Sequence, residues 1–251
     1  MREIPDIVYD PSIGEFGKLD LYLPETDSFP LLVYFHGGSL EKGSRRAAHI
    51  GKTLTERGIG LASAEYRLYP EAKYPDFILD AARAVNFCRE HIGEYCRDCR
   101  GIFVGGSSAG GYLSMMLCFD PKYLGQYGIA PTDIAGFVHN AGQPTCHFNV
   151  LRERGLDKRR VIIDDSAPLY HVGLADEYPP MLLMWSENDM VNRPEQMEVL
   201  CTALAHFGYD GDKIRRKVLP GKHCGYVKAI DENGNNVFAS EISDFILEFS
   251  K

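Results

Sequence analysis

The sequence lacks any apolar run that approaches the roughly 20 residues of a membrane-spanning helix. Its first residues also lack the apolar core of a signal peptide. These absences predict a cytoplasmic protein with no membrane partner, unless a leader segment has been removed. Basic residues are fewer than acidic ones, 27 against 35, and the net charge of −8 argues against nucleic acid or anionic membranes as partners.

Cysteine pairs that would indicate a disulfide framework or a metal site are also lacking. The seven cysteines are odd in number and scattered, which predicts reduced thiols. Cys96 and Cys99 form a C-x-x-C, but the second pair that such metal sites usually need is absent from the sequence. A surface turn with two thiols is therefore preferred to a redox or zinc site, and no metal or cofactor is expected.

No linker rich in Pro, Gly or Ser, no charge block and no repeat divides the sequence, so a single domain over residues 1–251 is expected. Short apolar runs alternate with helical patterns along the chain. Strands are predicted at 19–23, 31–35, 59–64, 102–104, 135–138, 181–185 and 214–219, and helices at 44–57, 75–91, 109–118, 193–207 and 237–249. This alternation predicts an α/β fold with a mostly parallel, doubly wound sheet and a half-exposed antiparallel strand, 19–23, at its N-terminal edge.

One stretch, residues 142–165, has no clean periodicity and is densely charged at 152–160. It follows a predicted strand, where open α/β sheets place their ligand crevice. A long insertion at that point is often a lid over the site. Its composition fits a solvated surface loop equally well. Both interpretations stay open.

The most informative motif is a Gly-x-Ser-x-Gly turn around Ser108, which follows the apolar strand 102–104 and precedes a predicted helix. A serine hydroxyl becomes a good nucleophile only when a base takes its proton and donors receive the oxyanion. A strand-to-helix turn exposes the hydroxyl on a sharp bend at a helix N-terminus. Ser108 fits the pattern better than Ser107, because Gly106 and Gly110 lie two residues on either side of it.

Candidate oxyanion donors follow the buried strand 31–35. Gly37 and Gly38 let the backbone bend and expose N–H groups there. Together with the N–H group of Ala109, the residue after the candidate nucleophile, they are predicted to form an oxyanion hole. A plain strand-exit turn is the alternative, and the nearby serine turn makes it the weaker one.

An acid and a base follow later strands in the chain. Asp189 comes just after the strand 181–185 and is preferred to Glu187, because its shorter side chain orients a histidine more tightly. His223 follows the last strand in a glycine-flanked loop, and the order serine, acid, histidine points to it among the eight histidines. Further candidate substrate contacts are Ser39, Leu40, Ser107, Tyr112 and Phe148.

These residues belong to a set of segments that carries a family resemblance. The set is HGG at 36–38, YRLYPE at 66–71, GSSAG at 106–110, SEND at 186–189 and GKH at 221–223. Together the segments resemble the α/β-hydrolase superfamily, in its esterase and lipase branch related to hormone-sensitive lipase and to bacterial feruloyl and acetyl esterases. The resemblance implies an eight-stranded, mostly parallel sheet with helices on both faces and a short insertion or lid after the sixth strand. It also implies a triad of Ser108, Asp189 and His223, with oxyanion donors at Gly37, Gly38 and Ala109.

Two features depart from relatives of hormone-sensitive lipase. Ser39 stands where those relatives usually have a third glycine, which leaves open which N–H groups point inward. The longer N-terminal cap of those relatives is absent, and the start of the chain looks more like compact esterases encoded beside polysaccharide-degrading enzymes. The aromatic pair typical of kynurenine formamidases is replaced by Ser39 and Leu40.

The resulting hypothesis is a serine carboxylic-ester hydrolase that cleaves short-chain acyl esters through an acyl-enzyme. Its substrate is expected to be a small-molecule or oligosaccharide ester, with an acetyl or feruloyl esterase of decorated carbohydrates as one form. An amidase, peptidase or formamidase would use the same triad. A non-catalytic binding protein on the same fold is the alternative of another class. The sequence does not indicate the oligomeric state.

Overall fold

The computed structural model describes residues 1–209 and 211–250, and an eight-stranded sheet runs through it. The strand order is β1-β2-β4-β3-β5-β6-β7-β8. The pairs β1–β2 and β2–β4 are antiparallel, and the pairs from β4–β3 onward are parallel. The strands are β1 (Arg2–Val8), β2 (Lys18–Leu23), β3 (Ser28–Phe35), β4 (Gly60–Ala64), β5 (Asp98–Ser107), β6 (Gly136–Asn140), β7 (Met181–Asn188) and β8 (Ile214–Lys222). The predicted mostly parallel sheet is confirmed.

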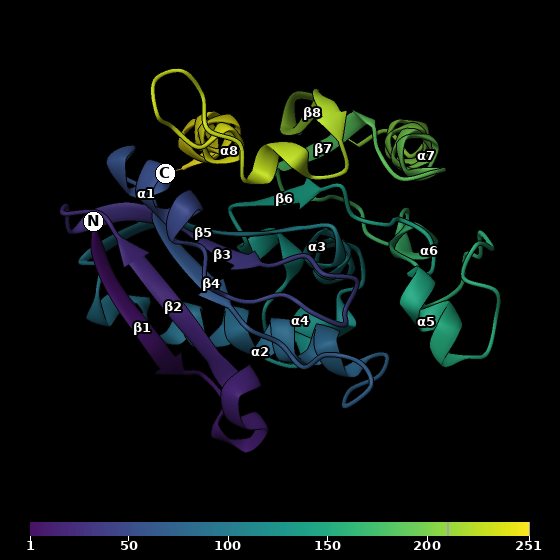
Figure 1. Ribbon diagram of the computed structural model, residues 1–251, viewed down its shortest axis with the longest axis horizontal. Coiled ribbons are helices and arrows are strands. Elements are labelled where there is room, and N and C mark those ends of the chain that lie inside the picture. The colour runs from purple at the N-terminus through teal and green to yellow at the C-terminus, as the bar shows by residue number, and fades with distance from the viewer. Residues whose placement is uncertain (210, 251) are drawn as a thin grey trace.

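Helices cover both faces of this sheet (Figure 1). They are α1 (Ala48–Glu56), α2 (Asp76–His91), α3 (Ala109–Phe119), α4 (Lys122–Gly125), α5 (Phe148–Glu153), α6 (Pro168–His171), α7 (Arg193–His206) and α8 (Val237–Phe249). Core residues of α1 and α8 share one cluster, whereas those of α2, α3 and α7 share the other. Figure 1 shows α8 beside α1 on one side of the sheet and α2 on the other.

The central strand β3 shows why the sheet needs helices on both faces. Leu31, Val33 and Phe35 pack in the cluster with α2 and α3, while Leu32 and Tyr34 pack in the cluster with α1 and α8. Successive side chains of a strand point to opposite faces, so a continuously apolar strand is stable only between two covered faces. No described helix is long and apolar enough to cross a membrane.

The prediction of a half-exposed edge strand at 19–23 is wrong. β2 is buried and lies inside the sheet, because the unpredicted strand β1 covers its outer side. The polar residue Asp20 suggested an exposed face, but its side chain is fully buried. It accepts hydrogen bonds from the guanidinium groups of Arg45 at 3.1 Å and Arg46 at 2.8 Å. The polar residue in the alternating pattern of β2 is therefore buried in an ion pair and does not indicate an exposed face.

Arg45 is the centre of this buried charge cluster. Its guanidinium pairs with Asp6 and Asp20 and with Glu65 at the end of β4, and its backbone N–H donates to the Glu65 carboxylate at 3.2 Å. The cluster ties the edge strands to the segment before α1. α1 begins at Ala48 and not at the predicted residue 44, and Arg45 and Arg46 form their ion pairs in the segment before it.

Replacing Arg45 by Met is expected to lower the free energy of unfolding by about 3 kcal/mol, because two buried carboxylates lose a partner. Urea denaturation at neutral pH measures this change. Arg159→Met serves as the control, since Arg159 and its partner Asp157 are exposed, and it should leave the denaturation midpoint unchanged. An unchanged midpoint for Arg45→Met would show that the cluster is not stabilising.

Candidate active site

Ser108 lies in a strained turn between β5 and α3. Its backbone angles are φ 57° and ψ −111°, a region that residues other than glycine rarely occupy. The Ser108 N–H donates to the carbonyl of Asn140 at 2.8 Å, which fixes the turn to the end of β6. This is the strand-turn-helix geometry that presents a serine hydroxyl at the carboxyl edge of a sheet.

The glycines of the motif are required by close backbone contacts. A Cβ atom at Gly110 would lie 1.9 Å from the carbonyl oxygen of Phe35 in β3. One at Gly106 would lie 2.4 Å from the backbone of Gly110. The start of α3 thus packs directly on the ends of β3 and β5, and only glycine allows that approach.

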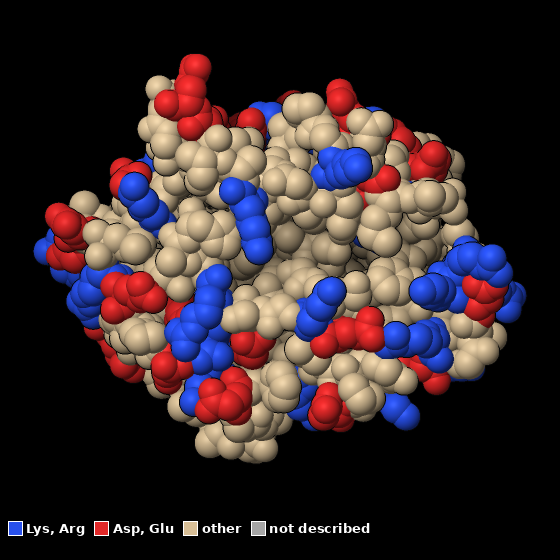
Figure 2. Space-filling view, viewed as in Figure 1, with Lys and Arg blue, Asp and Glu red and all other residues tan. Residues whose placement is uncertain are grey.

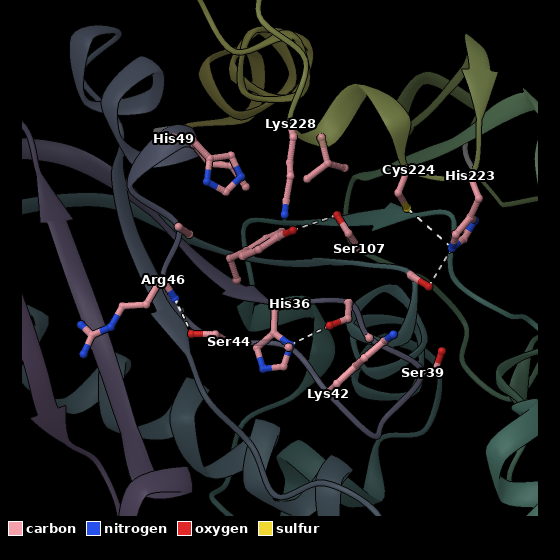
Figure 3. Close-up of a pocket in the computed structure, with 18 of the residues that line it drawn as sticks. His36, Ser39, Lys42, Ser44, Arg46, His49, Ser107, His223, Cys224 and Lys228 are labelled. Carbon is pink, nitrogen blue, oxygen red and sulfur yellow. Dashed lines mark hydrogen bonds between the residues drawn. The ribbon is translucent and has the colours of Figure 1, made fainter.

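His223 contacts both Ser108 and Asp189. Its Nε2 atom lies 2.8 Å from the Ser108 hydroxyl oxygen, and its Nδ1 atom lies 2.5 Å from Asp189 Oδ1. Figure 3 shows the His223 side chain at the edge of the pocket. The serine follows β5, the carboxylate follows β7 and the histidine follows β8, so the ends of parallel strands bring them to one edge of the sheet. The rival acid Glu187 is exposed and does not form this contact in the described structure.

The Asp189 carboxylate is fully buried and held by several donors. Burial alone would raise its pKa, but the hydrogen bond and charge of His223 and the N–H groups of Met190 and Ser186 keep the pKa below its usual value. Those N–H groups lie 2.7 Å and 3.1 Å from the carboxylate oxygens. Asp189 is therefore ionised at neutral pH and can orient the imidazole of His223.

The His-Gly-Gly turn lies against the candidate nucleophile. A Cβ atom at Gly37 would lie 2.9 Å from the Ser107 carbonyl oxygen and 3.2 Å from Ser108 Cβ. Gly38 has φ 130°, and its carbonyl accepts the N–H groups of residues 41 and 42 at 3.0 and 3.1 Å. Ala109 is the first residue of α3, so its N–H has no acceptor within the helix. This places the predicted oxyanion donors on both sides of Ser108.

Buried polar contacts hold the His-Gly-Gly turn in place. His36 lies 2.6 Å from the Glu65 carboxylate through Nε2 and 2.8 Å from the Gly37 carbonyl through Nδ1. The Tyr66 hydroxyl donates to the His36 carbonyl at 2.9 Å, and the two rings stack. Burial would raise the pKa of Glu65, but His36 and Arg45 keep it below its usual value. The buried charge cluster thus reaches the turn beside Ser108.

Ser107 has a different environment from Ser108. Its buried hydroxyl accepts hydrogen bonds from the Tyr34 hydroxyl at 2.9 Å and from the Asn140 side-chain amide at 2.8 Å. The Tyr226 hydroxyl in turn donates to Asn140 at 2.5 Å. Burial holds the pKa of Tyr34 well above its usual value, so the phenol stays protonated. Ser107 belongs to a network that braces the elbow, whereas Ser108 faces His223.

Ser108 opens onto a cleft of about 920 Å³. Figure 2 shows this hollow near the middle of the face, with Lys and Arg side chains at its rim. Two segments form most of its walls, residues 36–50 and 223–228. Apart from the His-Gly-Gly turn, Ser39 and His223, these wall residues were not singled out from the sequence, because residues 44–50 were read as the start of a helix and the others carry no motif.

The candidate substrate contacts divide into two groups. Ser39 and Ser107 line the cleft, together with Ser108. Leu40 and Tyr112 are buried outside it, and the Tyr112 hydroxyl donates to a backbone carbonyl at 2.8 Å. Phe148 lies outside the cleft as well and stacks on a neighbouring histidine. The expectation that Leu40, Tyr112 and Phe148 contact substrate is therefore not supported by their positions.

The segment 142–165 also lies outside the cleft, since none of its residues is among those that line it in the described structure. It contains the short helix α5, and its residues Cys146 and Leu151 pack in a small apolar cluster with Ala167, which follows the segment. Arg152 at its surface pairs with Glu41 at 2.6 Å. Its role as a lid stays a prediction.

The BD-FAE family model matches residues 19–126. The probable carboxylic ester hydrolase LipM of Mycobacterium tuberculosis is 30% identical over 206 residues, which cover 72% of this chain and 47% of LipM. The chain spans about half the length of the curated relatives it matches.

Similar solved structures extend over nearly the whole chain. A truncated carbohydrate esterase from gut microbiota superposes with a TM-score of 0.78 at 19% identity, covering 99% of this chain and 96% of that one. The chain therefore has the fold of the α/β-hydrolase esterases. Its sequence matches lie in the esterase branch. Esterase 2 of Thermogutta terrifontis, solved with propionate bound, has a TM-score of 0.72 at 21% identity and covers 97% of this chain and 93% of its own.

Substitution of Gly110 by Ala should destabilise the fold, because the added methyl group would meet backbone and not a flexible side chain. A loss of about 3 kcal/mol in the free energy of unfolding, or a failure to accumulate soluble protein, is expected. Gly125→Ala is the matched control, since nothing lies within 4 Å of its added Cβ. Equal stability of the two variants would contradict the close packing of α3 on β3.

Proposed function

We propose that the protein hydrolyses carboxylic esters through an acyl-enzyme at Ser108. The observation that carries this proposal is the continuous hydrogen-bonded line from Ser108 through His223 to the buried Asp189 carboxylate. A hydroxyl, an imidazole and a carboxylate in that order can move a proton off the hydroxyl while keeping the imidazole in one tautomer. The line ends at a cleft large enough for a small ester.

In the proposed first half-reaction, Ser108 Oγ attacks the ester carbonyl carbon and His223 Nε2 takes the hydroxyl proton. The carbonyl oxygen gains negative charge and accepts hydrogen bonds from the N–H groups of Gly37, Gly38 and Ala109. His223 then gives its proton to the departing alcohol. Asp189 remains ionised throughout and stabilises the imidazolium, in keeping with its lowered pKa.

In the proposed second half-reaction, water takes the place of the alcohol. His223 accepts a proton from this water as its oxygen attacks the acyl carbon, and the carboxylic acid leaves while Ser108 regains its proton. The oxyanion forms at the same donors in both halves. The braced His-Gly-Gly turn therefore matters twice in each turnover.

We further propose that the acyl group is short and that the alcohol can be a carbohydrate. Among the described residues, none from 142–165 lines the cleft, and its walls come mainly from the segments 36–50 and 223–228. A similar fold is found in a carbohydrate esterase and in an esterase solved with propionate. The match to the BD-FAE model agrees with an acetyl or feruloyl ester as substrate.

Replacing Ser108 by Ala removes the proposed nucleophile. A loss of kcat of at least about 10⁴-fold on p-nitrophenyl acetate is expected, since triad members act as a unit. Unfolding by urea checks that the variant is folded. If folded Ser108→Ala turns over the ester at the wild-type rate, the proposed function is wrong.

Replacing Gly37 by Ala tests the proposed oxyanion hole. The methyl group would press on Ser107 and Ser108 and displace the turn, so kcat should fall about 100-fold, as for loss of one oxyanion donor. KM should change less, because the donors act mainly in the transition state. Gly93→Ala, with nothing within 4 Å of its added Cβ, is the control. A kcat equal to that of the control would place the oxyanion donors elsewhere.

A further inference from the structure

Three basic residues from the two walls line the cleft that contains Ser108. Lys42 and Arg46 come from the segment before α1, and Lys228 comes from the segment after His223. Figure 3 shows the Lys42 and Lys228 side chains extending from opposite walls toward the space between them, whereas the Arg46 guanidinium points away from it. The rest of the lining is mostly apolar, backbone or hydroxyl.

No acidic residue balances these cations inside the cleft. Among the described residues that line it, none is Asp or Glu, although acidic residues outnumber basic ones in the whole chain. Within residues 1–209 and 211–250, neither Lys42 nor Lys228 forms an ion pair with a carboxylate. The cleft is therefore positively charged, whereas the whole chain has a net charge of −8.

The carboxylates closest in sequence to the cleft walls are already engaged elsewhere. Glu41, next to Lys42, pairs with Arg152 at 2.6 Å. Glu65 is held by His36 and Arg45. Asp20 and Asp6 pair with Arg46 at 2.8 and 3.1 Å, which compensates the charge of that guanidinium. The two lysine ammonium groups are therefore the uncompensated charges of the cleft.

His49 lies close to one of these two lysines. It lines the same end of the cleft as Lys228. Burial and the positive charge of Lys228 both lower the pKa of His49. Both side chains are partly open to solvent, and the ammonium group of Lys228 lies near enough to His49 to affect its ionisation.

We propose that the cleft selects esters that carry a carboxylate away from the scissile bond, on either the acyl or the alcohol half. Lys42 and Lys228 are the specificity-determining residues for that carboxylate. An anion that lies near two ammonium groups, between walls of low dielectric constant, gains more electrostatic stabilisation than it would at an open surface. This inference rests on the proposed ester hydrolysis at Ser108 and names its substrate class. Acidic sugars are one alcohol of this chemistry, and dicarboxylate half-esters are the acyl counterpart.

The test compares pairs of esters that differ only in charge. For the acyl half, the pair is the p-nitrophenyl half-ester of glutarate and its glutaramide analogue. For the alcohol half, the pair is 3-carboxyphenyl acetate and 3-carbamoylphenyl acetate. The ratio of kcat/KM within each pair is measured after subtraction of spontaneous hydrolysis, at low and at high NaCl. Whichever pair shows the preference identifies the half that carries the carboxylate.

The wild type should prefer the carboxylate over the amide in at least one pair, and added salt should reduce that preference, because the charges are near solvent. Lys42→Gln and Lys228→Gln should each lower the ratio about two- to fivefold, the range for one exposed ion pair. Lys158→Gln, which removes the same charge from an exposed site outside the cleft, should leave the ratio unchanged.

A ratio at or below one in both pairs overturns the inference, and so does a preference that survives in both Lys42→Gln and Lys228→Gln. The neutral amide esters separate this failure from a failure of the proposed function. Cleavage of these neutral esters that depends on Ser108, without any carboxylate preference, refutes only the substrate class. The absence of Ser108-dependent cleavage with all four esters refutes the proposed function itself.

Discussion

The structure depends on the close approach of α3 to the ends of β3 and β5. Only glycine at 106 and 110 allows this contact, since a Cβ atom at either position would overlap backbone. Because α3 lies so close to these strands, the chain turns sharply between β5 and α3. Ser108 lies in this turn and has a positive φ. The same turn directs its hydroxyl toward His223 and sets the first N–H of α3 beside it. The strain at one residue is thus the origin of the candidate site.

Two polar networks keep this strained turn in place from opposite sides. On one side, the Tyr34 hydroxyl and the Asn140 amide hold Ser107, and Tyr226 holds Asn140. On the other side, Glu65 holds His36 and with it the His-Gly-Gly turn. Buried polar groups cost stability unless they are fully hydrogen-bonded, and these networks meet that condition at most of their atoms. Their hydrogen bonds hold the residues around Ser108 in fixed positions.

The parallel part of the sheet and its flanking helices were predictable from the sequence, because buried strands read as continuous apolar runs and covering helices as periodic ones. The strand β1 was not, since both of its faces are largely exposed and its residues show no alternation. Tyr112 was misjudged as a substrate contact for a related reason. Every residue of α3 is buried, so an aromatic side chain on that helix belongs to the core.

The site shows the same division. Ser108, Asp189 and His223 could be chosen from the sequence because each follows a strand whose carboxyl end lies at one edge of the sheet. The walls of the cleft could not, because two segments far apart in the chain, 36–50 and 223–228, form them, and only the folded structure brings these loops and the start of α1 together. The lysines of the cleft become visible only once those loops are placed.

The central claim is that the hydroxyl of Ser108, activated by His223, is the nucleophile. A fluorophosphonate probe reacts covalently with such a hydroxyl, and mass spectrometry of the digested protein locates the adduct. The account predicts one adduct per chain on the peptide that contains Ser108, and its loss when His223 is replaced by Ala. An adduct on another residue would contradict the claim. Folded wild-type protein that is not labelled by the probe would contradict it as well.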